Sequence, residues 1–306
     1  MHILSNETNK NNYINFNSCK LHTGRASVNP CGARPRELLY ILCAFGAPII
    51  IRKELFMFVY IATFLAAILA GLVQAVSGFG AGIILMLVMP AYMPMLQASG
   101  TSSIMCMSGQ VTTLYSFRKE INFKTFFTDF IRDTLIPISC YIAGSVIVLN
   151  MVQGVDMTRL KLLFGIFLLV LAVYYLFLAK KAALKPDKKT GIFCGGLSGV
   201  FSGAFGIGGP LIAIYYLAYF GRDKVKYVTT LQVFFFVTSV VNMVTRILNG
   251  ILGLDCIPYV LIGFAGMAVG SSIGVRCVSK IDADMLKKII YGFIGLSGVL
   301  TIIQNL

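Results

Sequence analysis

Two related stretches of this sequence decide the fold: GLVQAVSGFGAG at residues 71–82 and GLSGVFSGAFGIGGP at residues 196–210. Both lie within long apolar runs, where an uninterrupted chain would form a continuous helix. Glycine has no Cβ and lets the backbone turn where other residues would be strained. Inside a bilayer, a broken helix is tolerated only where protein or a polar cavity surrounds it. We therefore expect a helix to break at each stretch.

The two stretches belong to an internal repeat with an offset of about 125 residues. Gly71-Leu72 and Ser77-Gly78 recur as Gly196-Leu197 and Ser202-Gly203. Four further matches keep nearly the same offset: Thr101-Ser102 with Thr229-Thr230, Arg118 with Arg246, Gly144-Ser145 with Gly270-Ser271, and Leu160-Lys161 with Leu286-Lys287. Matches at a fixed period are the signature of a duplicated structural unit.

The composition predicts a lipid bilayer around most of the chain. Of 306 residues, 57% are hydrophobic and 12% are charged, whereas soluble domains carry about 25% charged residues. The formal net charge of +14 would suggest nucleic acid in a soluble protein. Here the bases lie between apolar segments, as in cytoplasmic loops, so we expect no nucleic-acid partner.

The apolar segments predict an all-α, polytopic transmembrane helix bundle. They lie at 55–76, 82–97, 99–117, 130–150, 160–179, 192–205, 207–220, 227–248, 256–276 and 286–304. Counting each glycine-broken or re-entrant pair as one crossing gives about eight crossings, as two homologous four-helix halves. The expected organisation is an N-terminal tail at 1–54, disordered or interfacial, a first transmembrane repeat at 55–182 and a second at 190–306. A translation start at Met57 is an alternative to Met1.

Loop charge and small residues refine this expectation. The Lys and Arg clusters at 52–53, 118–124 and 180–189 place both termini in the cytoplasm, although the basic residues at 222–226 then fall outside.

Glycines recur every fourth residue at 191, 195, 199 and 203, and at 266, 270 and 274. Such stripes let helices approach closely, so we interpret both as packing faces.

The glycine breaks are the predicted substrate site. A broken helix presents free N–H groups and a partial positive charge at its N-terminus, which attracts anions. Two breaks, one from each half, would face each other as in other transporters built from repeats. The candidate backbone positions are Gly78, Gly80, Gly82, Gly203, Gly206, Gly208 and Gly209, with hydroxyls from Ser77 and Ser202. The small anionic substrate predicted here requires no cofactor and no metal.

Polar side chains on the following segments form a second layer of candidates: Ser102, Thr230 and Gln232, with Thr101, Ser103 and Thr229 beside them. Their hydroxyls could instead bond to their own helix. Arg118 and Arg246 end equivalent segments. We interpret Arg118 as an interfacial anchor, because Lys119 follows it. We include Arg246 in the candidate site, and the same anchoring role is its alternative.

No catalytic residues are predicted, and the chain is not expected to be an enzyme. The acidic residues, Asp133 among them, lie at or beyond the ends of the apolar segments, and both histidines lie in the tail. The eight cysteines form no CxxC pair, so we expect neither disulfides nor a zinc site; a thiol touching the substrate is the alternative. Proton coupling could use the substrate's own protonation. The oligomeric state stays open, a homo-oligomer included.

The paired motifs at 71–82 and 196–210 resemble the signatures of the TauE/SafE (sulfite exporter) family, over about residues 57–304. The resemblance implies a multi-pass plasma-membrane permease, usually bacterial, for sulfite or a related organosulfur anion. The chain departs from the family's longer glycine run, which is reduced here to Gly208-Gly209-Pro210. A passive anion channel and a membrane scaffold subunit remain the alternative functions.

Overall fold

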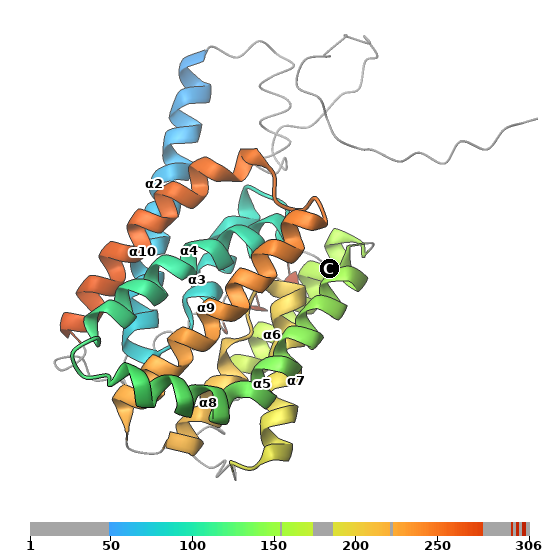
Figure 1. Cartoon of the computed structure of the whole chain (residues 1–306). Coiled ribbons are helices and arrows are strands. Elements are labelled where there is room, and N and C mark those ends of the chain that lie inside the picture. Colours follow the sequence, from blue (N-terminus) through green and yellow to red (C-terminus); the bar gives the residue numbers. More distant parts are fainter. Residues whose placement is uncertain are drawn as a thin grey trace, which may run out of the picture. The chain divides into compact units, whose positions relative to one another are not determined.

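The computed structural model describes residues 49–153, 155–173, 186–220 and 223–277, together with 295, 298, 299, 302 and 303. All regular structure among them is helical (Figure 1), which confirms the predicted all-α class. The predicted tail lies outside the described residues up to residue 48.

The helices follow the chain in this order: α2 (Ile49–Ser77), α3 (Ala81–Val88), η2 (Met89–Ala91), α4 (Met95–Ser116), α5 (Phe123–Val152), α6 (Met157–Val173), α7 (Lys188–Phe205), α8 (Gly209–Phe220), α9 (Lys224–Leu248), η4 (Leu254–Cys256) and α10 (Ile257–Cys277). By length and composition, four stretches among the described residues could cross a membrane: Phe56–Ser77, Thr125–Val152, Val225–Leu248 and Leu254–Arg276. The helix α4 is 22 residues long but rich in Ser, Thr and Gly, which lowers its apolar character.

Both predicted helix breaks are present. The first separates α2 from α3, and Gly78 and Gly80 there have φ values of 84° and 101°. The second separates α7 from α8, and Gly206 there has a φ of 71°. Side chains other than glycine rarely adopt this left-handed conformation. The glycines therefore end one helix and allow the next to start in a new direction.

The glycine stripes are packing faces, as predicted. Gly266, Gly270 and Gly274 of α10 lie against the backbone of α2, where a Cβ at Gly274 would come within 2.8 Å of the Leu72 carbonyl oxygen. The stripe on α7 lies in the same way against α5, facing the carbonyl groups of Pro137 and Tyr141. These two contacts join the most extensively packed helix pairs of the bundle.

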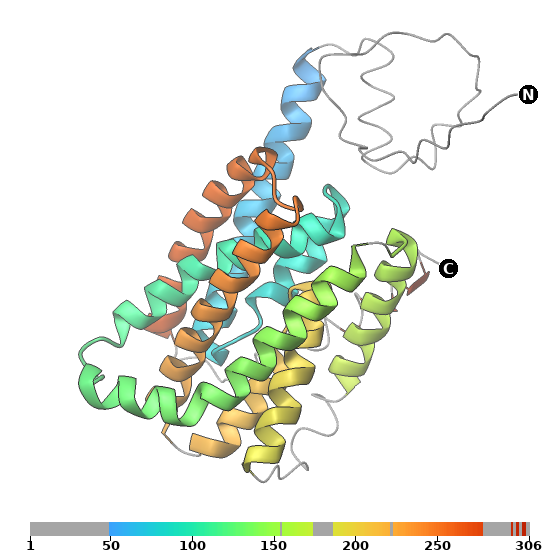
Figure 2. The same cartoon turned by 45° about the vertical axis from the view of Figure 1, so that its right-hand side comes forward.

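Each of these pairs combines one helix from each half of the sequence. The repeat relates α2 to α7 and α5 to α10, because Gly71 matches Gly196 and Gly144 matches Gly270. In Figures 1 and 2, α2 and α10 run downward, whereas α7 and α5 run upward. The related helices α4 and α9 also run in opposite directions. Helices that match in the sequence repeat thus run in opposite directions, and each closely packed pair combines helices that are far apart in the sequence.

Candidate functional site

A cavity of about 60 Å³ lies where the two helix breaks meet. Its wall contains residues from both breaks and from α4, α5 and α9: Gln74, Phe79, Gly80, Ala81, Gly82, Ile83, Ser103, Cys106, Gln110, Tyr141, Ser202, Gly206, Ile207, Gly208, Gly209, Pro210, Phe235, Thr238, Ser239 and Asn242. The prediction that both glycine stretches contribute to one site is therefore consistent with the geometry.

The breaks touch each other and leave no room for larger residues. A Cβ at Gly82 would come within 3.0 Å of the Gly206 carbonyl oxygen, and one at Gly206 would lie 3.0 Å from Ser99. At Gly208 a Cβ would approach the Ser198 carbonyl oxygen to 2.6 Å. Glycine is thus required here by close approach as well as by backbone conformation.

Two helices begin at the cavity wall, α3 at Ala81 and α8 at Gly209. Their first N–H groups have no partner within the helix, and each helix N-terminus carries about half a positive charge. Pro210, at the second position of α8, has no N–H to satisfy, and the N–H of Ile212 donates to the Ser198 hydroxyl at 3.1 Å. Both N-termini favour an anion in the cavity.

Hydroxyl and amide groups line the side of the cavity formed by α5, α7 and α9. The Asn242 amide nitrogen donates to the Ser202 hydroxyl at 3.1 Å, and Ser145 donates to the Asn242 oxygen at 3.0 Å. The Tyr141 hydroxyl lies beside Ser202 and Thr238. This side offers uncharged hydrogen-bond donors.

Arg246 lies directly behind this polar wall and is fully buried. Its Nη2 donates to the Ser99 hydroxyl at 2.8 Å and to the carbonyl oxygens of Gly203 at 3.2 Å and Ser202 at 3.4 Å. Its Nε and Nη1 have no hydrogen-bond partner among the described residues. A buried charge without a counter-charge costs several kcal/mol, so this guanidinium is set up to receive an anion.

The equivalent residue of the first half has a different environment. Arg118 is exposed; its Nη1 donates to the Tyr115 carbonyl oxygen at 2.8 Å, and its guanidinium lies 3.7 Å from the centre of the Tyr115 ring. This exposed environment agrees with the predicted role of Arg118 as an interfacial anchor. Arg246, in contrast, cannot act as a surface anchor.

A chain of amides connects the first helix break to the cavity wall at Gln74. The Gln232 nitrogen donates to the Gly78 carbonyl oxygen at 3.1 Å, and the Gln74 nitrogen donates to the Gln232 oxygen at 3.0 Å. The Oε1 atoms of Gln74 and Gln110 are buried and have no donor among the described residues. The cavity therefore combines a donor-rich side with two unpaired acceptors.

The predicted site residues fall into three groups. Those in the cavity wall are Gly80, Gly82, Ser202, Gly206, Gly208 and Gly209. Gly78, Gly203, Gln232 and Arg246 lie one layer behind and hold wall residues or each other through the bonds above. The hydroxyls of Ser77 and Ser102 donate to carbonyl oxygens of nearby residues, and Thr230 is buried outside the wall.

The sequence reading missed the side chains on the cavity-facing side of α4, α5 and α9. On α4 these are Cys106 and Gln110, which lie beside the predicted Ser103, and on α9 they are Phe235, Thr238, Ser239 and Asn242. Their three- and four-residue spacing places them on one helix face. A search for polar residues that lie three or four positions apart, on the helix face that contains Arg246, would have found part of this set.

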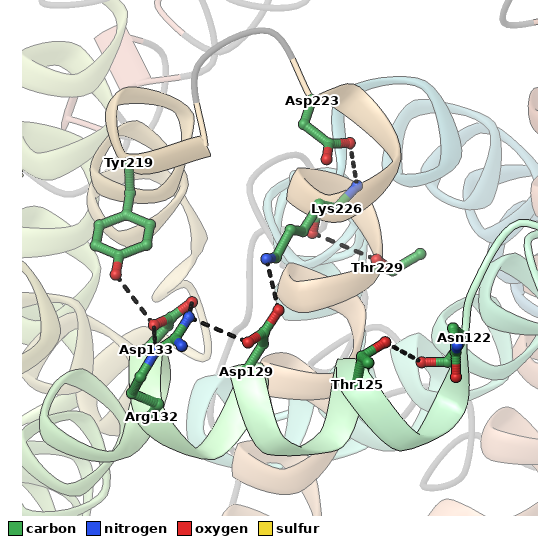
Figure 3. Close-up of polar contacts among 9 residues, drawn as sticks. All are labelled: Asn122, Thr125, Asp129, Arg132, Asp133, Tyr219, Asp223, Lys226 and Thr229. Atoms are coloured by element: carbon green, nitrogen blue, oxygen red, sulfur yellow. Dashed lines mark hydrogen bonds and ion pairs between the residues drawn. The ribbon is translucent and has the colours of Figure 1, made fainter.

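A second polar cluster joins α5 to α8 and α9 away from the cavity (Figure 3). Lys226 pairs with Asp129 at 2.9 Å, and Arg132 pairs with Asp129 at 3.1 Å and with Asp133 at 2.9 Å. The Tyr219 hydroxyl donates to Asp133 at 3.0 Å. Asp133 is only 8% exposed and lies inside the candidate span Thr125–Val152, so the expectation that acidic residues lie at or beyond segment ends does not hold there. Arg132 and Tyr219 make its burial tolerable.

A bundle of apolar helices around a polar cavity, with helix N-termini and a buried guanidinium beside it, is typical of membrane transporters. The chain belongs to the TauE/SafE sulfite exporter family, since the profile described as "Sulfite exporter TauE/SafE" matches residues 63–301. It is also 28% identical, over 217 residues, to a protein of Methanocaldococcus jannaschii named "Probable membrane transporter protein"; the alignment covers 66% of this chain and 77% of that protein. No solved structure gives a significant match.

Proposed function

We propose that this membrane transporter carries a small oxyanion through the cavity between the two helix breaks. The observation that carries the proposal is Arg246, a fully buried guanidinium with two nitrogens that have no partner among the described residues. An anion in the adjacent cavity would offset the cost of burying this charge. The N-termini of α3 and α8 add to the same positive potential.

The proposed substrate is sulfite or an organosulfur anion of similar size. The family supports the choice of sulfur chemistry, and the cavity volume favours a small member of this class. A cavity of about 60 Å³ is larger than the space that a single water needs and far smaller than the pockets of about 300–1,000 Å³ that hold drug-sized ligands. Sulfite, with one sulfur and three oxygens, fits this space better than a longer sulfonate does.

We further propose an alternating-access carrier built from two inverted halves, in the plasma membrane and with both termini in the cytoplasm. The expected four crossings per half do not fit this inversion, because an even number of crossings would leave equivalent helices parallel. The interlocked pairs α2–α10 and α5–α7 support rocking of one group of helices against another. The mechanism involves no covalent step, so the protein is not an enzyme. Charge on the substrate is balanced by Arg246 and by helix dipoles.

The test is the flux of radiolabelled sulfite into proteoliposomes that contain the purified protein. Saturable flux is expected from a carrier, whereas flux that stays linear with concentration would indicate a channel. Replacing Arg246 by Gln removes a buried positive charge that lies one layer behind the cavity wall, and an interaction with a charged group is worth about 1.5–3 kcal/mol. A loss of about 3 kcal/mol weakens binding by a factor of about 100.

The matched control is Arg118→Gln, which changes the equivalent arginine at an exposed position. This variant should transport at the wild-type rate. Equal flux from the Arg246→Gln and Arg118→Gln variants would contradict the assigned role of Arg246. The absence of any sulfite, sulfate or thiosulfate flux from folded wild-type protein would contradict the proposed function itself.

A further inference from the structure

We infer that the cavity selects an oxyanion that still carries one proton, and that Gln74 and Gln110 accept the hydrogen bond from its O–H group. Each transported anion would then carry its proton across the membrane. The inference rests on the proposed function, because it specifies which protonation state of the anion enters the same site. It assigns to the two glutamines the role of determining this specificity.

The direction of the Gln74 side chain follows from its neighbours. The Gly78 carbonyl group can only accept a hydrogen bond, so Gln232 must turn its nitrogen toward it, at 3.1 Å. The Gln232 oxygen then accepts from the Gln74 nitrogen, at 3.0 Å. This order leaves the Gln74 Oε1 as an acceptor, buried and without a donor among the described residues.

Gln110 supplies a second acceptor on the same cavity wall. It follows Ser103 and Cys106 on one face of α4, at intervals of three and four residues. Its residue exposure is 2%, and its Oε1 also has no donor among the described residues. A buried acceptor left unpaired costs about 1–3 kcal/mol. A ligand that donates a hydrogen bond removes this cost.

A fully deprotonated oxyanion does not suit such a cavity. All its oxygens are acceptors, so they would pair with the donors near Ser202, Asn242 and Arg246 but would be repelled by the glutamine oxygens. A singly protonated oxyanion presents bare oxygens to the donors and its O–H group to the acceptors. Sites built around one such hydrogen bond reject analogues that lack it by factors of up to about 10⁴.

Among the described residues, the cavity wall contains no group that ordinarily titrates near neutral pH. The titratable side chains in the cavity wall are Cys106 of α4 and Tyr141 of α5. Arg246 of α9 lies behind the wall, and Tyr227 of α9 donates to the Ser77 carbonyl oxygen near Gln74, at 3.3 Å. Cysteine, tyrosine and arginine ordinarily titrate above neutral pH. A dependence of flux on pH near neutrality would therefore report the ligand.

The experiment measures sulfite flux into proteoliposomes at a constant total concentration while the pH is raised through the second ionisation of sulfite. Flux should follow the concentration of hydrogen sulfite, falling about tenfold per pH unit above that ionisation. Sulfate, which is fully deprotonated at these pH values, should compete at least 100-fold more weakly than sulfite. A pH-sensitive dye inside the vesicles should record one proton per anion.

Two variants of α4 test the glutamines. Gln110→Leu removes the acceptor and should reduce the preference for hydrogen sulfite by at least tenfold, which flattens the pH profile. Gln97→Leu is the matched control, because Gln97 bonds to Asp255 outside the cavity, at 2.8 Å, and its pH profile should equal that of the wild type. Monodispersity in detergent establishes that each variant is folded.

Three results would overturn the inference while leaving the proposed function intact: flux that follows the sulfite dianion, strong competition by sulfate, or flux that requires Na⁺, which amide oxygens could coordinate. An unchanged pH profile in folded Gln110→Leu protein would overturn the role of Gln110. Wild-type protein that moves none of these anions would refute both the inference and the proposed function.

Discussion

Replacing Gly199 by Ala should destabilise the bundle, whereas replacing Gly196 by Ala should not. The two glycines lie three residues apart on α7. A Cβ at Gly199 would meet the Tyr141 backbone of α5, coming within 2.8 Å of its carbonyl carbon, whereas a Cβ at Gly196 would have nothing within 4 Å. Comparing the two variants therefore separates the effect of close helix packing on stability from the effect of helix propensity.

The expected magnitudes follow from these surroundings. Ala is better than Gly within a helix by about 1 kcal/mol, so Gly196→Ala should be stabilising by about that amount. At Gly199 the same gain is opposed by overpacking, which costs about 1–3 kcal/mol and more where the obstacle cannot move. Because the obstacle here is backbone, we expect a net loss of about 2 kcal/mol.

The apparent Tm of both variants in one detergent provides the measurement. One kcal/mol corresponds to about 2–4 °C for a chain of about 150–250 residues. Gly196→Ala should thus unfold at a Tm about 2–4 °C higher than the wild type, and Gly199→Ala at a Tm about 4–8 °C lower. Equal Tm values for the two variants would show that α5 and α7 are not in backbone contact.

Three further predictions concern other parts of the bundle. Replacing Gly206 by Val should abolish sulfite flux, because the residue has a φ of 71° and a Cβ there would lie 3.0 Å from Ser99; flux equal to the wild type, from protein that is monodisperse in detergent, would argue for a scaffold role. Lys226→Met should lower the apparent Tm only slightly, since partly exposed pairs contribute at most about 1 kcal/mol and Asp129 keeps its ion pair with Arg132; a decrease as large as that expected for Gly199→Ala would contradict this estimate. The Thr190 hydroxyl and N–H groups that bond to Asp187 hold the pKa of its carboxyl below the usual value. Asp187 is the N-cap of α7, and the stability that its carboxylate adds is present above the ordinary Asp pKa of about 3.9 and is lost as the pH falls through the lower folded value. Asp187→Asn should therefore weaken the acid dependence of the apparent Tm.

The helix breaks and the packing stripes could be predicted because local rules govern them. A glycine run inside an apolar segment has few conformational alternatives in a membrane, and a four-residue glycine period can serve only one helix face. The helix boundaries at Ser77 and Gly209 followed from these rules. The repeat identified which helices correspond, although it did not reveal that equivalent helices run in opposite directions.

The side chains of the cavity depend on tertiary structure, and for this reason the prediction was incomplete. Tyr141 and Asn242 reach the cavity because α5 and α9 lie beside the second break, which no local pattern shows. The environment of Arg246 is also tertiary, since Arg118 occupies the equivalent position and is exposed. Asp133 is buried because Tyr219, 86 residues away, reaches it.

The exchange of helices between the halves has a consequence for biosynthesis. The stripe-bearing helix α10 begins about 180 residues after α2 ends. At roughly 5–20 residues per second, α2 stays in the membrane for about 9–36 seconds before the ribosome has made its main partner. During this interval neither half is a self-sufficient folding unit. The nascent chain therefore depends on lipid or on a membrane chaperone to shield α2 until synthesis of α10 is complete.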